Sequence, residues 1–536
     1  MFASFLPFLV IIPIIIAVFL YVFAGLKSAR MAAVVTQTAY AVLAFFLLVA
    51  SREDEIYVSV GGYEGFLGII LRVDNLAAVF ILLTVIIFLA VVIYNLRSQY
   101  DHTGRLYWFL LFILEGALIG LFMTRDLFNI FVLVEVSTVV VVVLLMYDRQ
   151  RRNLFAGMTF IMVNIVVMQF YLFGLGYLYM VAGVMDMEAA ASVISGMDTR
   201  DLALPYALIM TSVAAKCSLL PLLTWLPKVN SLTGSRFTIA AIMSGLYVKS
   251  GIYLFIRFQY VFGGMGAELF LVLGIVTAFG GIVLALAQKD IRLMLAYSTV
   301  AQAGLIVAGF SLGLSHCCEY SQLGAIFHAV NHGLIKVALF LLAGIISFLY
   351  KTTDITKIRG LFGVSPSIGL ATLLAVLGIG GAPFFGGFVS KYFMSVAATG
   401  GLWWVFMAVN LGTVLVFIRF SAMFFGRAEG ATPAPDWCRE GIVLGLGFLC
   451  FGMGVFGEWV IGFLLNVPVG LSFWGYLEKI GVFGVSVGVG VLVYGYVLAK
   501  KDYLRPLRGL SLGFKALCVS IGLFFAVVLV YAGVIS

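Results

Sequence analysis

Charged residues are scarce in this chain of 536 residues. They make up 10% of the sequence, whereas hydrophobic residues make up 63% and the mean hydropathy is +1.16. A soluble globular domain carries about 25% charged residues, so the composition excludes a soluble protein. The sequence predicts an all-α polytopic membrane protein with almost no room for a soluble domain.

Cysteine is also scarce, and its spacing excludes two kinds of chemistry. Iron–sulfur clusters need closely spaced cysteine thiolates, and disulfide frameworks need regularly spaced pairs. The six cysteines show neither pattern: Cys217, Cys317, Cys318, Cys438, Cys450 and Cys518. We therefore expect no cofactor and no metal in this chain, and any redox chemistry would belong to partner subunits, which leaves its assignment as an enzyme uncertain.

About sixteen apolar runs are long enough to cross a membrane. A hydrocarbon core of about 30 Å needs roughly 20 apolar residues per helix. The first run lacks a basic segment and a cleavage site, so it is predicted as a membrane helix and not as a signal peptide. The runs cover residues 4–25, 31–50, 75–97, 107–124, 127–147, 154–182, 203–226, 237–261, 269–288, 293–315, 320–349, 366–391, 402–426, 441–465, 480–499 and 512–534.

The distribution of loop charge tests this helix count. Loops after odd-numbered runs are rich in Lys and Arg, as in DRQRRN at 148–153, whereas loops after even-numbered runs are acidic, as in SREDE at 51–55. Basic loops stay in the cytoplasm. The pattern predicts a prokaryotic cell (inner) membrane protein with both termini extracytoplasmic. The net charge of +8 then reflects the basic residues of the cytoplasmic loops. We expect no nucleic-acid partner.

One outside loop predicts a small sheet. Residues 51–74 contain the strand-forming segments YVSV and GIILRV around the glycine-containing turn GGYEGF. This arrangement is typical of a β-hairpin.

A few charges remain inside the predicted helices. A charge at the bilayer centre costs at least about 2.5–3.5 kcal/mol, so such residues commonly face a polar interior and mark an ion path. Arg257 and Arg419 lie toward helix ends, where a long side chain reaches the interface. Glu115 fits a structural partner or an accessory site equally well. The complete set is Glu115, Glu135, Lys216, Lys249, Arg257, Lys336, Lys391 and Arg419.

Two of the four histidines share one predicted helix with a lysine. His328, His332 and Lys336 are spaced i, i+4 and i+8, which places them along one helical face. Two histidines are too few for a zinc site, and a packed structural role is the other alternative. Imidazole takes up and releases protons near neutral pH, so a proton relay is the favoured interpretation.

Two predicted helices contain breaks beside a lysine. Pro221 follows Lys216 by five residues, and Pro383 lies in GIGGAPFFGGFVSK, which ends at Lys391. A proline removes a backbone hydrogen bond and frees carbonyls that protein or water must satisfy in a membrane. Paired interrupted helices in the two halves of a transporter indicate its ion path.

Several segments, in order, resemble one family. AAKCSLLPLLTWLP, DLFNIFVLVEVS, LYVKSGIYLFIRF, AQKDIRLMLAYSTVAQAG, HAVNHGLIKVALFLLAG and GAPFFGGFVSK are similar to segments of the proton-translocating, antiporter-like subunits. This family is shared by Mrp cation/proton antiporters, respiratory complex I (the NADH-quinone oxidoreductase) and membrane-bound hydrogenases. The resemblance covers roughly residues 60–465 and is strongest to the D-type Mrp subunits. Lys228 and the longer loop after it depart from the family pattern.

The resemblance implies an architecture and a set of roles. It implies two inverted five-helix repeats, helices 4–8 and 9–13, with helices 7 and 12 interrupted. The chain would then divide into residues 1–106, 107–261, 266–426 and 441–536. By position, Glu135 and Lys216 would form a charge-switching pair, Lys249 would connect the repeats, His328 and His332 would lie on the central axis, and Lys391 would be the lysine of the second broken helix.

These expectations give one leading function and two alternatives. We expect an ion-transport subunit that moves protons, with Na+ as a further candidate ion, within a multisubunit complex of the lipid bilayer. A proton-pumping subunit of an NADH-quinone oxidoreductase or membrane-bound hydrogenase is the first alternative. A stand-alone secondary transporter is the second.

Overall fold

The computed structural model describes residues 3–23, 27–60, 69–96, 104–232, 237–428, 436–500, 502–510 and 512–534. Across these residues the chain is helical apart from two short strands and the connecting loops. Fourteen of the described helices are long and apolar enough to cross a membrane. The prediction of an all-α polytopic membrane protein is confirmed.

The remaining two predicted runs correspond to shorter or more polar helices. The run 203–226 overlaps α8 (Thr199–Lys216), and the run 366–391 covers α16 (Pro366–Gly380) and overlaps α17 (Gly386–Met394). Both α8 and α16 end at an interruption. Each of the sixteen predicted runs therefore overlaps a described helix.

The chain forms two compact units. The first unit contains Met1–Cys217, Ser250–Gly266 and Gly513–Ser536. The four-part division implied by the inverted repeats stays a prediction. The elements of the first unit are η1 (Ala3–Phe5), α1 (Leu6–Phe23), α2 (Lys27–Ala50), β1 (Ile56–Ser59), β2 (Ile70–Val73), α3 (Asn75–Tyr94), α4 (Arg105–Met123), α5 (Leu127–Met146), α6 (Arg151–Ala182), α7 (Met187–Ile194), α8, most of α11 (Val248–Val261) and α22 (Phe514–Val534).

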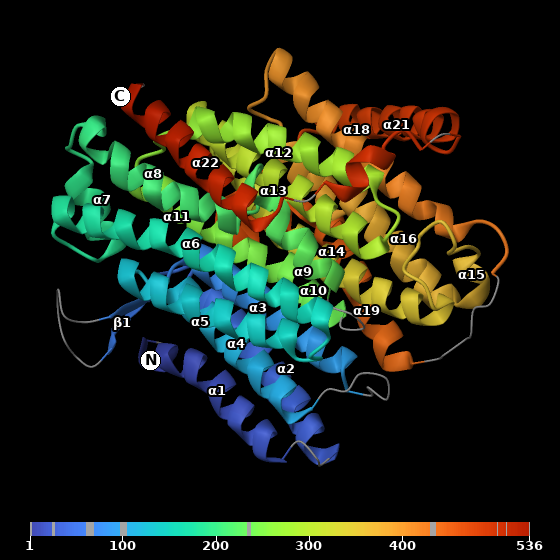
Figure 1. Cartoon of the computed structure of the whole chain (residues 1–536), viewed down its shortest axis with the longest axis horizontal. Coiled ribbons are helices and arrows are strands. Elements are labelled where there is room, and N and C mark those ends of the chain that lie inside the picture. Colours follow the sequence, from blue (N-terminus) through green and yellow to red (C-terminus); the bar gives the residue numbers. More distant parts are fainter. Residues whose placement is uncertain are drawn as a thin grey trace. The chain divides into compact units, whose positions relative to one another are not determined.

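The helices of the first unit pack against both sequential and distant neighbours. Helix α4 packs against α1 and α5, and α6 packs against α5 and α8. The last helix, α22, red in Figure 1, lies against α8 although some 300 residues separate them in sequence. Its buried residues recur at helical spacing (Leu517, Ile521, Phe524, Val528 and Ala532), which gives it one apolar face for this contact.

The predicted hairpin is present. Strands β1 and β2 pair antiparallel, with Ile56 opposite Val73 and Ser59 opposite Ile70. The turn GGYEGF lies outside the described residues. The loop between α6 and α8 contains the short helix α7, whose Met187, Ala190 and Ile194 are buried.

Aspartates of the loops begin several membrane helices. The side chain of Asp74 accepts a hydrogen bond from the backbone N–H of Ala77 at the start of α3. Asp126 does the same for α5. These carboxylates satisfy backbone donors that have no partner within the helix, so acidic residues at loop ends also fix where helices start.

The second unit contains Ser218–Lys249 and Ala267–Leu512. Its elements are η4 (Leu222–Thr224), α9 (Trp225–Leu232), α10 (Phe237–Ile242), the π-helical turn η5 (Met243–Tyr247), the start of α11, α12 (Ala267–Ala287), α13 (Ile291–Ser315), α14 (Glu319–Tyr350), α15 (Leu361–Val364), α16, α17, α18 (Gly401–Ser421), η6 (Ala422–Phe424), α19 (Trp437–Val455), α20 (Gly457–Leu465), α21 (Phe473–Val493), the π-helical turn η7 (Tyr494–Leu498) and η8 (Arg505–Gly509).

Helix α14 is the core of the second unit. It contacts α10, α13, α16, α17 and α19, and nearly all of its 32 residues are buried. Other helices surround α14, and most of its sides are apolar, as is typical of a buried helix. The polar stripe predicted on this helix is therefore enclosed by protein.

Candidate functional site

The first interruption lies between α8 and α9. Helix α8 ends at Lys216, and Ser218 takes a left-handed conformation with φ +58°. An interruption is present in this region, but the helix ends at Lys216, five residues before Pro221. Lys216 is consequently the last helical residue, at the negative end of the helix dipole, where a cation is favoured.

The second interruption lies between α16 and α17. Helix α16 ends at Gly380, Gly381 has φ +79°, and α17 begins at Gly386, three residues after Pro383. A left-handed residue just after a helix is the position where glycine is most favoured. The break leaves the carbonyls of Ile379 and Gly380 without helical partners, and both accept hydrogen bonds from Nζ of Lys391.

In the first unit, Lys216 is held by two uncharged side chains. Its Nζ donates to Oδ1 of Asn164 on α6 at 2.6 Å and to Oγ1 of Thr138 on α5 at 3.2 Å. Each acceptor is fixed by a second bond, because Asn164 donates to the carbonyl of Phe160 and Thr138 donates to that of Val134. The lone pairs of both acceptors therefore point at the ammonium.

Glu135 lies one turn before Thr138 on the same helix. Thr138, three residues further along α5, is one of the two side chains that hold Lys216. Oε1 of Glu135 is buried and makes no hydrogen bond within the described residues. The structure thus places both members of the predicted pair at the same part of α5, because Glu135 lies on this helix and Lys216 donates to its Thr138.

Gly251 on α11 sets the position of the Lys216 backbone. A Cβ atom added at Gly251 would lie 2.7 Å from the carbonyl carbon of Lys216 and 2.9 Å from the nitrogen of Cys217. Such approaches are shorter than van der Waals contact, so only glycine fits between α11 and the end of α8.

In the second unit, Lys249 follows a π-helical turn that the sequence did not predict. Its side chain is fully buried, and Nζ donates to the carbonyl of Ser244 within that turn at 2.6 Å. The Ser244 hydroxyl accepts a hydrogen bond from Nδ2 of Asn230 on α9 at 2.8 Å. A π-helical turn widens the helix locally and is frequent at functional positions.

His328 on α14 is bonded on both sides. Its Nε2 is 2.9 Å from Oε1 of Gln302 on α13, and its Nδ1 is 2.7 Å from the hydroxyl of Ser390 on α17. Gln302 donates from its amide nitrogen to Oγ1 of Thr413, which itself donates to the carbonyl of Val409.

This chain of bonds assigns the tautomer of His328. Because Thr413 donates to a backbone carbonyl, it accepts from Gln302, and the amide oxygen of Gln302 then faces the ring. An amide oxygen only accepts, so Nε2 carries the hydrogen. The unprotonated Nδ1 faces the Ser390 hydroxyl, whose hydrogen is shared between this nitrogen and the carbonyl of Gly387, and Nδ1 is the atom that can take up a proton.

His332 and Lys336 continue the stripe along α14. The rings of His328 and His332 are nearly parallel, with centroids 6.1 Å apart. Neither ring nitrogen of His332 has a partner within the described residues. Nζ of Lys336 donates to the carbonyl of Leu295 at 3.0 Å and to the hydroxyl of Ser298.

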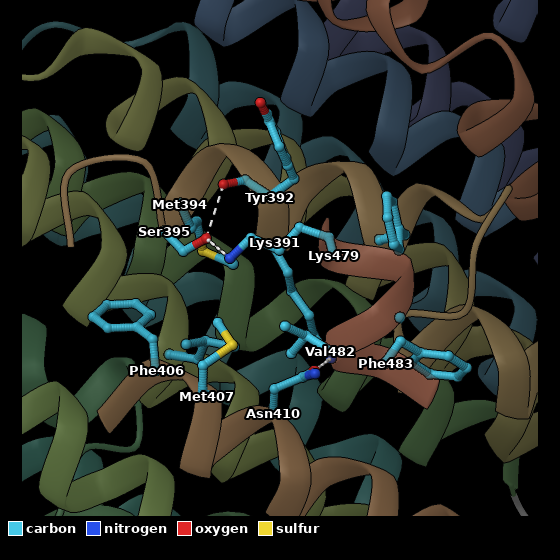
Figure 2. Close-up of a pocket in the computed structure, with 13 residues that line it drawn as sticks. Lys391, Tyr392, Met394, Ser395, Phe406, Met407, Asn410, Lys479, Val482 and Phe483 are labelled. Atoms are coloured by element: carbon cyan, nitrogen blue, oxygen red, sulfur yellow. Dashed lines mark hydrogen bonds between the residues drawn. The ribbon is translucent and has the colours of Figure 1, made fainter. Parts of the chain in front are cut away.

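Lys391 on α17 is held by three neutral oxygens. In addition to the two carbonyls of the interruption, at 3.1 and 3.3 Å, its Nζ donates to Oδ1 of Asn410 on α18 at 2.9 Å. Figure 2 shows the side chain extending toward Asn410 at the edge of a cavity.

Three of the predicted membrane charges lie apart from these sites. Glu115 is fully buried on α4, where it accepts a hydrogen bond from the amide of Gln37 on α2 at 2.5 Å and not from a lysine. Arg257 forms a two-bond ion pair with Asp74, at 2.5 and 2.7 Å. Arg419 lies in the last turn of α18, near a helix end as predicted.

Lys228, which departs from the family pattern, makes a hydrogen bond to the backbone. Its Nζ donates to the carbonyl of Leu512 at 2.6 Å. It therefore joins α9 to the segment that precedes α22 in the chain.

Sequence reasoning missed the neutral partners of the charged residues. The direct partners of the lysines and of His328 are Thr138, Asn164, Ser298, Gln302, Ser390 and Asn410, and Asn230 and Thr413 lie one hydrogen bond further away. Each is an amide or hydroxyl residue inside an apolar helix, and that is the signal by which they could have been found.

The fold and these buried amines define a class of polytopic membrane protein whose helical core contains a series of ionisable residues. Residues 124–416 match the family described as NADH:quinone oxidoreductase/Mrp antiporter, transmembrane. The match covers more than half of the chain, and the chain belongs to this family. The predicted resemblance is confirmed.

Two curated relatives come from different branches of the family. The chain is 29% identical over 430 residues to the D-type subunit of the Na+/H+ antiporter of Alkalihalophilus pseudofirmus, covering 77% of this chain and 84% of the relative. It is 30% identical over 449 residues to the N-type subunit of the NADH-quinone oxidoreductase of Desulforudis audaxviator, covering 77% and 87%.

Two solved structures share the fold. A chain of the Mrp complex from Dietzia sp. superposes with a TM-score of 0.79 at 20% identity, covering 95% of this chain and 100% of the other. A chain of the archaeal membrane-bound sulfane sulfur reductase also gives 0.79, at 23% identity, covering 91% and 99%. Both structures are multisubunit membrane complexes.

Proposed function

We propose that this chain is a proton-translocating subunit of a multisubunit membrane complex, most like the D-type subunit of an Mrp-type Na+/H+ antiporter. In the first unit the proposed groups are Glu135 and Lys216. In the second they are Lys249, His328, His332, Lys336 and Lys391.

One observation carries this proposal. The buried lysines of the second unit, Lys249, Lys336 and Lys391, donate to carbonyl, hydroxyl and amide oxygens. A lysine in an ion pair loses both the proton and the pair when it deprotonates, whereas a lysine held by neutral oxygens loses only the proton. Such lysines suit a relay that protonates and deprotonates in each cycle.

In the first unit, Glu135 and Lys216 support a switch. When the carboxylate is charged and close, it stabilises the ammonium of Lys216. When Glu135 is neutralised, Lys216 stays with Asn164 and Thr138 and gives up its proton more readily. The two interruptions support a role for both lysines, because Lys216 is the last residue of α8 and Lys391 donates to the carbonyls at the end of α16.

Helix α5 supports the presence of a partner subunit. Glu135 is only half-buried and lies beside a row of exposed apolar residues, Phe128, Val132, Val136, Val139 and Val143. A carboxylate facing lipid is costly, so a neighbouring membrane subunit covering this face is favoured over a stand-alone transporter. We also infer a cell-membrane location with both termini outside the cytoplasm, from the distribution of basic loops.

Replacement of Lys216 or Glu135 by Ala tests the proposal. Each variant is expected to abolish proton translocation in sealed vesicles while the complex still assembles, and Lys228→Ala serves as the control. Unchanged translocation in the Lys216 and Glu135 variants would reject the function.

The similarity to the N-type NADH-quinone oxidoreductase subunit supports a second candidate, a proton-pumping subunit of a redox enzyme. Purification of the intact complex separates the two. Quinone- or hydrogen-linked electron transfer in the complex would favour the redox pump, and Na+-dependent proton movement without electron transfer would favour the antiporter.

A further inference from the structure

A cavity of about 40 Å³ lies beside Lys391 in the second unit. Figure 2 shows its walls, formed by α17, α18 and α21. One water needs about 10–15 Å³ of such space and two to four polar partners. The lining supplies these partners through Lys391, Ser395, Asn410 and Lys479, so the cavity can hold water.

Lys479 is a membrane lysine that the sequence placed in a loop. Helix α21 begins at Phe473, seven residues before the predicted run, and so includes Lys479. Nζ of Lys479 donates to Oγ of Ser395 at 2.8 Å and lies 5.8 Å from the ring centroid of Trp403. The Ser395 hydroxyl donates in turn to the carbonyl of Tyr392. These hydrogen-bonding partners are neutral, as they are for Lys391, whereas the carboxylate that acts on Lys479, that of the preceding residue Glu478, lies outside the cavity lining.

The groups that line the cavity favour protons over metal cations. Its lining holds two amines, Lys391 and Lys479, and no carboxylate. Hard cations take oxygen ligands, carboxylates in particular, and the ammonium group that the lysine pair carries repels them. A proton, by contrast, binds an amine nitrogen.

We propose that this cavity is an aqueous proton-exchange site that connects Lys391 to Lys479, and that the second unit moves protons and not Na+. The inference rests on the proposed function and names its ion and a further residue. The ammonium of Lys391 releases a proton to water in the cavity, and the neutral amine of Lys479 takes one up. One N–H bond breaks and one forms, no electron moves, and the pair keeps a single positive charge.

Cysteine labelling tests whether water reaches the cavity. In a chain whose six native cysteines have been replaced, Met407→Cys introduces a thiol into the lining, and Val409→Cys places one on the same helix at a buried position outside it. A membrane-impermeant, water-soluble thiol reagent applied to the intact complex is expected to label Met407→Cys at least tenfold faster than Val409→Cys. Equal, slow labelling of both would overturn the proposal.

Substitutions of Lys479 test proton exchange. Arginine keeps the positive charge but does not deprotonate, whereas histidine exchanges protons near neutral pH. Lys479→Arg and Lys479→Met are each expected to lower the translocation rate of the assembled complex on the order of tenfold or more, and Lys479→His to retain most of it. A fully active Lys479→Arg complex would mean that Lys479 contributes charge alone, and the inference would fail.

The proposed function and the exchange site can fail separately. If Lys216→Ala abolishes translocation but Lys479→Arg and Lys479→Met leave it intact, the proposed function stands and this inference is wrong. If the unmodified complex translocates no protons, the function fails, and the labelling still reports whether water reaches Lys391.

Discussion

Oδ1 of Asn164 accepts a 2.6 Å hydrogen bond from Nζ of Lys216, and the amide is held in that orientation by its own bond to the carbonyl of Phe160. The lysine at the end of α8 is thus met by the oxygen of an uncharged group. An amide oxygen stabilises the ammonium without binding it as strongly as a carboxylate would. Lys216 can therefore respond to the charge of Glu135.

Replacement of Asn164 should change translocation in two ways. Asn164→Leu removes the acceptor and disfavours the charged lysine, whereas Asn164→Asp supplies a carboxylate that holds it charged. Both variants are expected to slow proton translocation by about tenfold or more, measured in sealed vesicles. Thr159→Val, which removes an exposed hydroxyl of the same helix, is the control. Full activity in Asn164→Asp would contradict the switching role.

Gly251→Ala should displace the end of α8. The added Cβ would overlap the Lys216 backbone, and overpacking of this kind costs about 1–3 kcal/mol. A lower midpoint of thermal unfolding and slower translocation are expected together. Gly176→Ala, where a Cβ meets no atom within 4 Å, should change neither. Wild-type stability in Gly251→Ala would show that the close approach is readily relieved.

Gln302 is expected to control the protonation of His328. Gln302→Leu removes the oxygen that keeps the hydrogen on Nε2 of His328. In part of the molecules the hydrogen then lies on Nδ1, which no longer accepts from Ser390. Translocation should fall by about tenfold with assembly unchanged. Gln302→Glu keeps an acceptor at this position and should retain more activity than Gln302→Leu. The reverse order of the two variants would argue against tautomer control.

Asp74 should make stability depend on pH in acid. Burial raises the pKa of its carboxyl, but the ion pairs with Arg257 and Arg125 outweigh burial and hold the pKa below its ordinary value. The folded-state pKa is thus lower than the unfolded value of about 3.9. The stabilisation is present above about pH 4 and is lost as the pH falls further.

Asp74→Asn tests this dependence. At pH 7 the variant is expected to be less stable by ~3 kcal/mol, because it leaves two arginines without their carboxylate. The difference from the unmodified protein should shrink as the pH is lowered below about 4, in thermal unfolding followed by tryptophan fluorescence. The exposed Asp54→Asn serves as the control. A difference that stays constant with pH would contradict the ion-pair explanation.

The sequence predicted most of the fold because membrane insertion imposes a length and an apolarity on each helix. The hairpin strands and both interruptions were also predicted. Two helix boundaries differ from the predicted ones. Helix α8 ends earlier, because Ser218 and not Pro221 first departs from the helix, and α21 starts earlier and so includes Lys479. Loop propensity and hydropathy do not resolve a left-handed residue or a lysine within two turns of a helix end.

The candidate site was predicted at its charged residues and missed at its neutral ones. Lys216 and His328 are conspicuous because charge and imidazole are rare in lipid. Asn164 and Gln302 look like ordinary helical residues until tertiary packing brings them to those groups from sequence separations of 52 and 26 residues. The π-helical turn before Lys249 contains no proline, and its Gly245 does not predict the turn because glycine is common in membrane helices.

The place of α22 has a consequence for biosynthesis. This helix packs on α8, which carries Lys216, yet the ribosome makes it after every other element of either unit. The first unit therefore cannot be completed when its own early helices have been inserted. Helix α8, which carries Lys216, lacks its packing contact with α22 until α22 has been translated. The unit that begins first is therefore completed last.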